Sequence, residues 1–245
     1  MGGGADAEGA EPGSAAWWAQ RRATDAKRRP RADGLTTARI VEAAMDIVDR
    51  EGLDALTVRR LADRFGTSSG SLYRHIDSRE ELVVLIIDHA LGGVDLTPDP
   101  RGWRASSEAI LTSLRAATMR HPRFLPAVQS FPLRGPNALR VIDGVLAVFL
   151  GAGLGPAQAT YASTACLNYV FGASALLSGP AGLRPPSAPI LMDAQEAARV
   201  YPPDSHPALQ EAEGEFATLT ADDLFPNGLA IVLDGIAARF GRSSD

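Results

Sequence analysis

The chain has 245 residues, of which 45% are hydrophobic and 22% are charged. This balance is that of a globular protein, and the length allows a module of about 50 residues beside a larger domain with its own core. No apolar run reaches the roughly 18 residues of a membrane span, and no basic segment followed by an apolar one begins the chain. The single cysteine, Cys166, excludes an intramolecular disulfide. We therefore expect a cytoplasmic protein that does not enter a membrane.

The formal net charge is −5, but the charge is unevenly distributed along the sequence. Phosphate binding depends on local positive charge on one face rather than on the sum. Between Trp18 and Arg31 the one acidic residue is Asp25, and the basic residues are Arg21, Arg22, Lys27, Arg28, Arg29 and Arg31. The last third of the chain is acidic. This asymmetry suits a protein that presents one end to a polyanion.

Residues 1–34 show no helical periodicity, and we expect them to form a disordered basic N-terminal arm. From Thr36 onwards, apolar residues recur at steps of three and four, which is the pattern of amphipathic helices. The pattern predicts helices over residues 37–51, 57–65, 68–76 and 78–90. The candidate N-caps are Thr36 or Thr37, Thr57, Thr67 or Ser68, and Ser78, which forms a capping box with Glu81. Gly52 and Gly66 follow the first two helices and end them.

Glycines and prolines from Gly92 to Pro100 mark a boundary, and longer periodic segments follow it. These segments predict helices over residues 103–120, 123–130, 137–150, 157–177 and 222–240. A proline-rich loop over residues 179–207 is expected to carry at most one short helix, near residues 194–200. No segment shows sustained alternation with a period of two, so we predict an all-α fold.

Residues 56–76 carry the most informative pattern, which is two short helices that meet at Gly66. The apolar residues that would fill the angle between them are Leu61, Ala62, Phe65, Leu72 and Ile76. The outer face of the second helix keeps small, hydroxylated, aromatic and cationic side chains, namely Ser68, Ser69, Gly70, Tyr73 and Arg74. Such side chains suit the major groove of DNA and its phosphates.

The stretch from Leu35 to Leu85 closely resembles the tetracycline-repressor (TetR) family of bacterial regulators. Its most specific parts are Leu72-Tyr73-Arg74-His75 and Ser78-Arg79-Glu80-Glu81-Leu82. The proline-rich loop and the sequence around Phe225, Gly228, Leu229, Leu233, Asp234 and Gly235 also match the tetracycline-repressor subgroup. The resemblance implies an N-terminal three-helix helix-turn-helix head over residues 35–80, followed by a larger helical ligand-binding and dimerisation domain over residues 81–241.

The resemblance also implies roles for individual residues of the head. It assigns base-reading positions to Arg59, Ser69 and Gly70. It assigns phosphate-contacting positions, which set the register on the duplex, to Thr57, Tyr73 and Arg79. Ser68, Arg74 and His75 complete the predicted DNA-binding set. Gly70 departs from the family, in which a larger side chain is common at this position.

Three of these assignments have a structural alternative. Tyr73 can pack on the domain, although Leu72 and Ile76 already fill the inward face. Arg59 can be a solvated surface charge. The basic arm can be a flexible tail rather than a segment that lies along the duplex or enters the minor groove.

Six polar and aromatic residues are candidates for a pocket that binds a small-molecule inducer of unknown identity, and they are His121, Phe124, Gln129, Phe131, Asn168 and Phe171. Each can instead be interpreted as a core or loop residue. The metal-coordinating histidines of the tetracycline repressor are not evident, so we predict neither tetracycline nor a metal nor another cofactor. Cys166, within an apolar helix, is expected to pack rather than to sense redox state.

An enzyme is one alternative class, but its usual sequence signals are missing. The four histidines are widely spaced, and no zinc-protease, P-loop or nucleophile-elbow motif is present. Gly151–Gly155 superficially resembles a dinucleotide loop, but its spacing is wrong and no predicted strand precedes it. We therefore predict no enzyme and no catalytic residues. Another alternative is a helical dimeric small-molecule-binding or interaction protein with a vestigial DNA-binding head.

The favoured hypothesis is a homodimeric transcriptional regulator that binds palindromic double-stranded operator DNA. Its two recognition helices would enter successive major grooves about 34–36 Å apart. A small molecule would release the protein by binding a dimer state whose heads are wrongly spaced for the operator. Repression is the favoured mode of action, and activation is the alternative.

Overall fold

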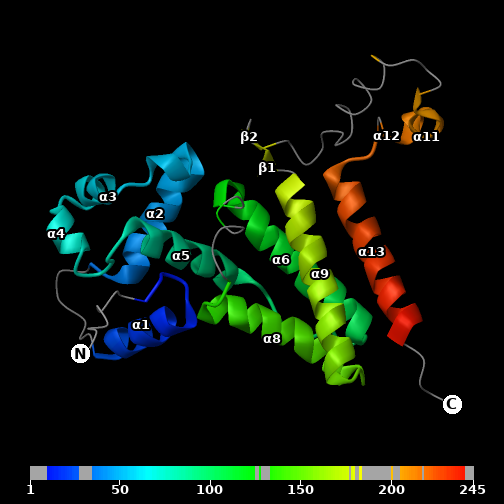
Figure 1. Cartoon of the computed structure of the whole chain (residues 1–245), viewed down its shortest axis with the longest axis horizontal. Coiled ribbons are helices and arrows are strands. Elements are labelled where there is room, and N and C mark those ends of the chain that lie inside the picture. Colours follow the sequence, from blue (N-terminus) through cyan, green and yellow to red (C-terminus); the bar gives the residue numbers. More distant parts are fainter. Residues whose placement is uncertain are drawn as a thin grey trace, which may run out of the picture. The chain divides into compact units, whose positions relative to one another are not determined.

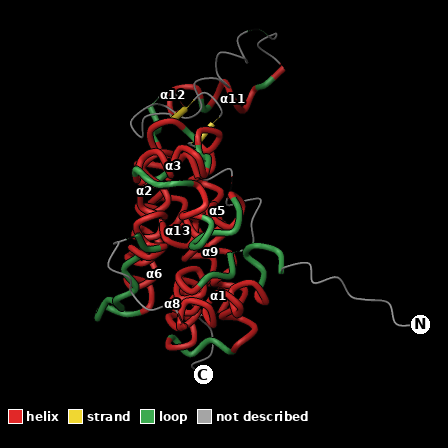
Figure 2. Tube along the Cα trace, turned by 90° about the vertical axis from the view of Figure 1, so that its left-hand side faces the viewer, coloured by secondary structure: helices red, strands yellow, loops and turns green. Residues whose placement is uncertain are grey.

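In the computed structural model, helices make up most of the described chain (Figure 1, Figure 2). The described residues are 10–27, 35–124, 127, 133–176, 178–179, 182–183, 200, 205–216 and 218–240. Their contacts divide the chain into two compact units, one of Met1–Leu96 with Ala116–Val145 and the other of Thr97–Arg115 with Leu146–Asp245. The all-α prediction is confirmed apart from one antiparallel pair of two-residue strands, β1 (Ser178–Gly179) and β2 (Gly182–Leu183).

The first unit contains the helix-turn-helix. It begins with α1 (Ala15–Lys27), α2 (Thr37–Glu51) and η1 (Leu53–Ala55). The helix-turn-helix follows as α3 (Val58–Phe65) and α4 (Ser69–Leu72), and then come α5 (Arg79–Ala90) and η2 (Leu91–Gly93). The end of α6 (Trp103–Arg120), η3 (Pro122–Phe124) and the first part of α8 (Pro136–Gly151) complete the unit.

The predicted helix boundaries of this unit are largely confirmed, because short-range signals set them. Thr36, Thr57 and Ser78 each accept a hydrogen bond at the N-terminus of their helix, from Arg39 N, Arg60 N and Glu81 N respectively. Gly66 ends α3 in the left-handed conformation, with φ of 60°. A residue without a Cβ adopts this conformation at little cost, so the chain turns sharply between α3 and α4.

The core of the head is the predicted apolar set. Leu61, Leu72 and Ile76 are fully buried, together with Ile40 of α2 and Leu82 of α5. Truncating one such side chain to alanine typically costs about 2–5 kcal/mol. The recognition helix therefore lies on a rigid base, and its exposed residues are positioned by the buried ones.

The recognition segment is less regular than the sequence predicts. The helix expected over residues 68–76 is α-helical from Ser69 to Leu72 and then continues as a turn. The backbone N–H groups of His75 and Ile76 both bond the Leu72 carbonyl, at 2.7 and 3.0 Å. Serine and glycine favour helices weakly, so the short Ser-Gly-Ser segment supports only about one turn.

The N-terminal segment is a correction to the sequence analysis, because residues 15–27 of the supposedly disordered arm form α1. Ser14 caps this helix by accepting a hydrogen bond from Trp17 N, at 3.2 Å. Trp17 is 8% exposed, and Trp18 stacks edge-on against it. The two tryptophans supply apolar area that a disordered arm lacks, which is why this segment can fold. Residues 1–9 and 28–34 lie outside the described residues.

Two long-range polar contacts join α5 to the start of α8. The Asp88 carboxylate accepts hydrogen bonds from the first backbone N–H groups of α8, Asn137 N at 3.1 Å and Ala138 N at 3.0 Å. Arg140 donates in the opposite direction to carbonyls at the end of α5 and in η2, including Leu91 O and Gly92 O. Burial raises the pKa of Asp88, while its hydrogen bonds to α8 oppose the shift. Asp88 thus caps the start of α8, and Arg140 of α8 binds the turn that follows α5, so that the two helices are joined at both points.

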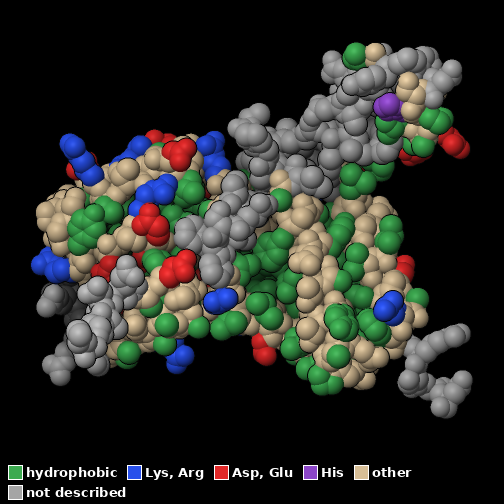
Figure 3. All heavy atoms as spheres, viewed as in Figure 1, with side chains coloured by type: hydrophobic (Ala, Val, Ile, Leu, Met, Phe, Trp, Pro, Cys, Tyr) green, Lys and Arg blue, Asp and Glu red, His purple; other side chains and the backbone are tan. Residues whose placement is uncertain are grey.

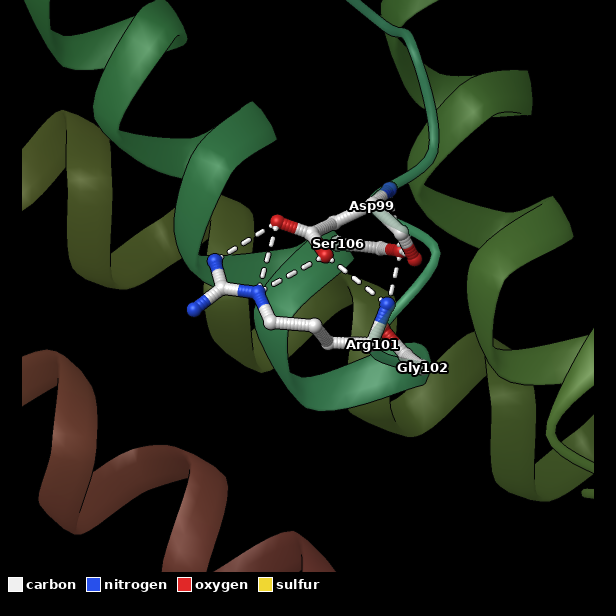
Figure 4. Close-up of polar contacts among 4 residues, drawn as sticks. All are labelled: Asp99, Arg101, Gly102 and Ser106. Carbon is white, nitrogen blue, oxygen red and sulfur yellow. Dashed lines mark hydrogen bonds and ion pairs between the residues drawn. The ribbon is translucent and has the colours of Figure 1, made fainter.

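The second unit begins with a capped turn at the N-terminus of α6 (Figure 4). The Asp99 carboxylate accepts hydrogen bonds from the backbone and the guanidinium of Arg101, and these bonds lower its pKa to about 2. Ser106 Oγ accepts a hydrogen bond from Asp99 N at 2.9 Å and donates to Gly102 O at 2.9 Å. These hydrogen bonds hold the turn that precedes α6, which begins at Trp103.

The remaining helices of the second unit are the end of α8, α9 (Pro156–Leu176), α11 (Pro207–Glu211), α12 (Glu213–Phe216) and α13 (Ala221–Phe240). Tyr169 of α9 stacks on Phe225 of α13, and its hydroxyl donates to Phe225 O at 2.9 Å. A Cβ at Gly228 would collide with this tyrosine ring. Pro226 lies inside α13 and has no backbone N–H, and the tyrosine hydroxyl binds the carbonyls of the two residues before it.

Two predicted segments are only partly within the described residues. Of the helix predicted over 123–130, the structure describes η3 and residue 127, and the prediction over 194–200 lies outside the described residues except for Val200. Among the described helices, none has both the length and the apolar character that crossing a membrane requires.

Candidate nucleic-acid interface

The outer face of α3 and α4 is polar and exposed. Tyr73 is 50% exposed, although its neighbour Leu72 is fully buried. Arg59 and Gly70 are also exposed, and Lys and Arg side chains gather over this end of the first unit (Figure 3). The helix-turn-helix therefore directs its apolar residues inward and leaves a surface of hydroxyl, phenol and guanidinium groups outward, as DNA recognition requires.

The start of the recognition helix is organised by serines. Ser68 is its N-cap and accepts a hydrogen bond from Ser71 N at 3.3 Å. Ser71 Oγ in turn accepts from the guanidinium of Arg74, at 3.0 Å. A Cβ at Gly70 would have Ser68 Oγ, 3.8 Å away, as its nearest neighbour, so the site has room for a larger side chain.

The arginines of α3 differ in their partners. Arg60 forms an ion pair with Glu51, and Arg64 forms one with Asp46. Arg59 is exposed and forms no ion pair or hydrogen bond among the described residues. Of these three guanidinium groups, Arg59 is therefore the one that can meet a base edge without first giving up a carboxylate.

Arg79 has a different environment from the other predicted phosphate-contacting residues. Its Nε donates to Leu56 O at 3.0 Å, and its Nη2 donates to Leu53 O at 2.8 Å. These carbonyls belong to the η1 segment between α2 and α3. Arg79 is half-buried and ties that segment to the start of α5, so its geometry favours a structural role. Its contact with phosphate stays a prediction.

His75 and Thr57 also take part in the packing of the head. The His75 carbonyl accepts a hydrogen bond from Arg21 of α1 at 3.1 Å, and the imidazole is half-buried. Thr57 is exposed and caps α3 through its hydroxyl. Their DNA contacts stay predictions.

The described candidate ligand residues fall into two pairs, one in each unit. The rings of His121 and Phe124 lie 6.0 Å apart in the first unit, and Asn168 and Phe171 lie three positions apart on α9 in the second. Phe124 is 3% exposed and belongs to the core of the head. His121 Nδ1 lies 2.8 Å from Asp49 Oδ2 of α2. Asn168 is exposed and Phe171 half-buried on α9, in the second unit. Gln129 and Phe131 lie outside the described residues.

Sequence reasoning missed a set of buried charged residues in the first unit. They are Arg21, Glu81 and Asp88, together with the inward orientation of Arg79. The capping-box pattern singled out Glu81, but nothing local indicated its partner Arg21, which is 60 positions earlier in the chain. Burial of a charged residue beside an opposite charge can be detected only in the folded chain.

A three-helix head with an exposed recognition helix and long following helices defines a class, the helical helix-turn-helix regulators. The family model described as "Bacterial regulatory proteins, tetR family" matches residues 40–86. The model described as "Tetracyclin repressor-like, C-terminal domain" matches residues 97–240. The chain belongs to the tetracycline-repressor family, and the resemblance drawn from the sequence is confirmed.

The individual relatives to which the chain is similar include helix-turn-helix transcriptional regulators. The chain is 37% identical over 142 residues to the HTH-type transcriptional repressor DrrR1 of Streptomyces coeruleorubidus, covering 57% of this chain and 53% of that protein. It is 36% identical over 139 residues to an HTH-type transcriptional regulator of Saccharopolyspora erythraea, covering 56% of this chain and 59% of that protein. The chain thus spans between half and two thirds of these relatives.

Among solved structures, the Streptomyces coelicolor TetR family protein ActR in complex with actinorhodin is similar over nearly its whole length. The TM-score is 0.74 at 30% identity, and the match covers 85% of this chain and 99% of that chain.

Proposed function

We propose that this protein is a sequence-specific DNA-binding repressor that a small molecule releases from its operator. The observation that carries the proposal is the outer face of α3 and α4, where Tyr73 and Arg59 are exposed on a fully buried base of Leu61, Leu72 and Ile76. The buried side chains hold the two helices in place, and the exposed phenol and guanidinium are available to contact DNA. The repressor named among its relatives supports the same function.

Within this proposal, the residues on and beside the outer face of α3 and α4 have two roles. Arg59, Ser69 and Gly70 read base edges, and Arg59 addresses guanine through its two parallel N–H groups. Thr57, Ser68, Tyr73, Arg74 and His75 contact the phosphate backbone and set the register. Arg79 acts through the packing of η1 and α5, because its donors already bind the Leu53 and Leu56 carbonyls.

We propose that the functional form is a homodimer held by α9 and α13. These helices pack on one another, and each carries a large exposed apolar residue, Tyr161 at 69% and Ile231 at 71%. Exposed residues of this size on two neighbouring helices are typical of a surface that a second copy covers. Two heads then bind two half-sites of a palindrome, about 34–36 Å apart.

Release by a small molecule is supported by the ActR structure, in which that protein holds actinorhodin. For this chain we propose an inducer of unidentified chemistry and retain Asn168 and Phe171 as candidate contacts. The inducer must bind the DNA-free dimer more tightly than the DNA-bound one. By linkage, operator DNA then weakens inducer binding by the same factor.

Regulation by binding is favoured over catalysis, because the relatives that match are regulators. We also propose that the protein acts in the cytoplasm, where its DNA target lies. A helical small-molecule-binding protein with a vestigial head would lack sequence preference, and this difference decides between the two functions.

Selection from a pool of random DNA duplexes tests the proposal directly. Full-length protein is mixed with the pool, bound duplexes are separated and amplified, and the enriched sequences are read after several rounds. We expect a palindrome whose half-sites lie about one helical turn apart, centre to centre. Failure to enrich any sequence would contradict a sequence-specific regulator and favour the vestigial head.

A further inference from the structure

Helix α1 is anchored to the recognition segment by a buried arginine. The side chain of Arg21 is 10% exposed, whereas Arg22 beside it is exposed. The Arg21 guanidinium donates to His75 O at 3.1 Å and to Thr37 Oγ1 at 3.3 Å. It therefore bridges the start of α2 and the last turn of the segment that carries Tyr73.

The acidic partner of Arg21 lies at the junction between the recognition segment and α5. Glu81, whose side chain is 2% exposed, forms an ion pair with Arg21. The same carboxylate accepts a hydrogen bond from Asp77 N at 2.6 Å, and Ser78 Oγ accepts one from Glu81 N. Arg21 and Glu81 thus hold both the carbonyl of His75 and the amide of Asp77, two positions apart in the turn.

A second anchor lies three positions earlier on α1, beside the start of α8. The Trp18 ring and the Asp88 carboxylate both lie against Gly135, where a Cβ would be 2.7 Å from the tryptophan ring. Trp18 also lines a small cavity with Val84 and Ile87 of α5. Helix α1 therefore contacts the recognition segment at one point and the α5–α8 pair at another.

We propose that α1 is a strap that positions the recognition segment for DNA, with Arg21 as its positioning residue, a role that rests on the proposed function. A buried ion pair contributes little net stability, because desolvation of both charges offsets their attraction. The pair instead fixes the backbone of His75 and Asp77, which directly follow the predicted DNA-contacting residues Tyr73 and Arg74. Since Arg21 is buried, it acts through the backbone of this turn rather than by touching DNA.

The test compares Arg21→Met with Arg22→Met in the full chain. Both variants lose one positive charge from neighbouring positions, but only Arg21 is buried and bound to His75. The readouts are amide hydrogen exchange over residues 71–78, affinity for the selected duplex and for a scrambled duplex, and the dependence of affinity on salt.

For Arg21→Met we expect amide hydrogen exchange in the turn to become about tenfold faster. This factor corresponds to the loss of one charged hydrogen bond. Affinity for the selected duplex should fall about tenfold, while affinity for scrambled DNA and the salt slope stay unchanged. Arg22→Met should leave both the exchange and the sequence preference unchanged. Unaltered exchange in Arg21→Met, or a salt slope lower by about one unit, would overturn the proposal.

A double variant separates positioning from folding. Arg21→Met leaves Glu81 buried and unpaired, which is destabilising, whereas Arg21→Met with Glu81→Leu removes both charges. We expect the double variant to recover thermal stability but not sequence preference, because the bonds to His75 and Thr37 stay lost. Full recovery of sequence preference would overturn the role of the strap. If the wild-type protein itself shows no preference, the proposed function fails, whereas the exchange measurement still tests the strap alone.

Discussion

Arginines on the two sides of the head differ in exposure and in hydrogen-bond partners. Arg59 lies on the outer face, exposed and without a partner among the described residues. On the inner side, Arg21 and Arg79 direct their donors at backbone carbonyls of the head itself. Under the proposed function, arginine thus reads DNA from one face of the head and holds backbone segments together on the other.

This difference has a consequence for interpreting mutations. A substitution of an outward arginine changes binding and leaves folding intact, since surface side chains contribute little to stability. A substitution of an inward arginine leaves buried carbonyls without a donor and changes folding first. Measurements of stability and of DNA affinity, made together on each variant, separate the two groups.

The largest expected effect is that of Arg79→Ala. It removes charged hydrogen bonds to the Leu53 and Leu56 carbonyls, each worth about 1.5–3 kcal/mol. We expect the free energy of unfolding in urea to fall by about 3 kcal/mol. A variant of wild-type stability whose salt slope for DNA binding falls by about one unit would instead identify Arg79 as a phosphate contact.

The next effect is that of Arg59→Ala, which should be confined to recognition. We expect unfolding in urea to be unchanged and discrimination at one base pair of the selected duplex to fall by about 1–3 kcal/mol. Competition binding with duplexes substituted one base pair at a time measures this. A loss that is equal for all sequences would reassign Arg59 to the backbone.

A smaller effect is expected for Tyr73→Phe, which deletes only a hydroxyl. The ring is 50% exposed, so the stability of the free protein should not change. If the hydroxyl donates to phosphate, affinity should fall about fivefold for every duplex, equivalent to about 1 kcal/mol. Unchanged affinity for all duplexes would show that the hydroxyl makes no contact.

The smallest effect concerns Cys166 of the second unit, which is fully buried. Burial raises its pKa to about 12, so at pH 8 the thiol is protonated and should resist alkylation by iodoacetamide in the folded protein. Because folding raises this pKa, the folded protein holds the thiol proton more tightly than the unfolded chain does. The resulting contribution to the free energy of unfolding is fully present below the ordinary pKa near 9 and is lost as the pH rises towards 12. Mass spectrometry of the alkylated protein and urea unfolding at pH 8 and pH 10 measure both. Rapid labelling at pH 8 would contradict the buried thiol.

What the sequence predicted well depended on contacts between near neighbours. The caps Thr36, Thr57 and Ser78 and the stop at Gly66 act within four residues, so a pattern along the chain reveals them. The inward partners of Arg79 are 23 and 26 positions away, and no local pattern contains them. The outward face was predictable because the buried positions determine which residues remain outside.

The N-terminal segment illustrates the same limit. Its lack of helical periodicity predicted disorder, yet Trp17 is buried and Arg21 binds a carbonyl 54 positions later in the chain. Whether such a segment folds depends on the surface against which it packs, and that surface exists only in the tertiary structure. The candidate ligand residues were chosen as polar and aromatic side chains of the middle helices, and the structure shows that one of them, Phe124, packs in the core of the head.

The most direct test of the central claim is an anisotropy titration of the full-length protein against a labelled selected duplex and a scrambled one, at about 0.15 M salt. We predict binding at two protomers per duplex, at least about a thousandfold tighter than to the scrambled sequence. Weak binding that is equal for the two duplexes would contradict the account, because the outer face of α3 and α4 would then read no sequence.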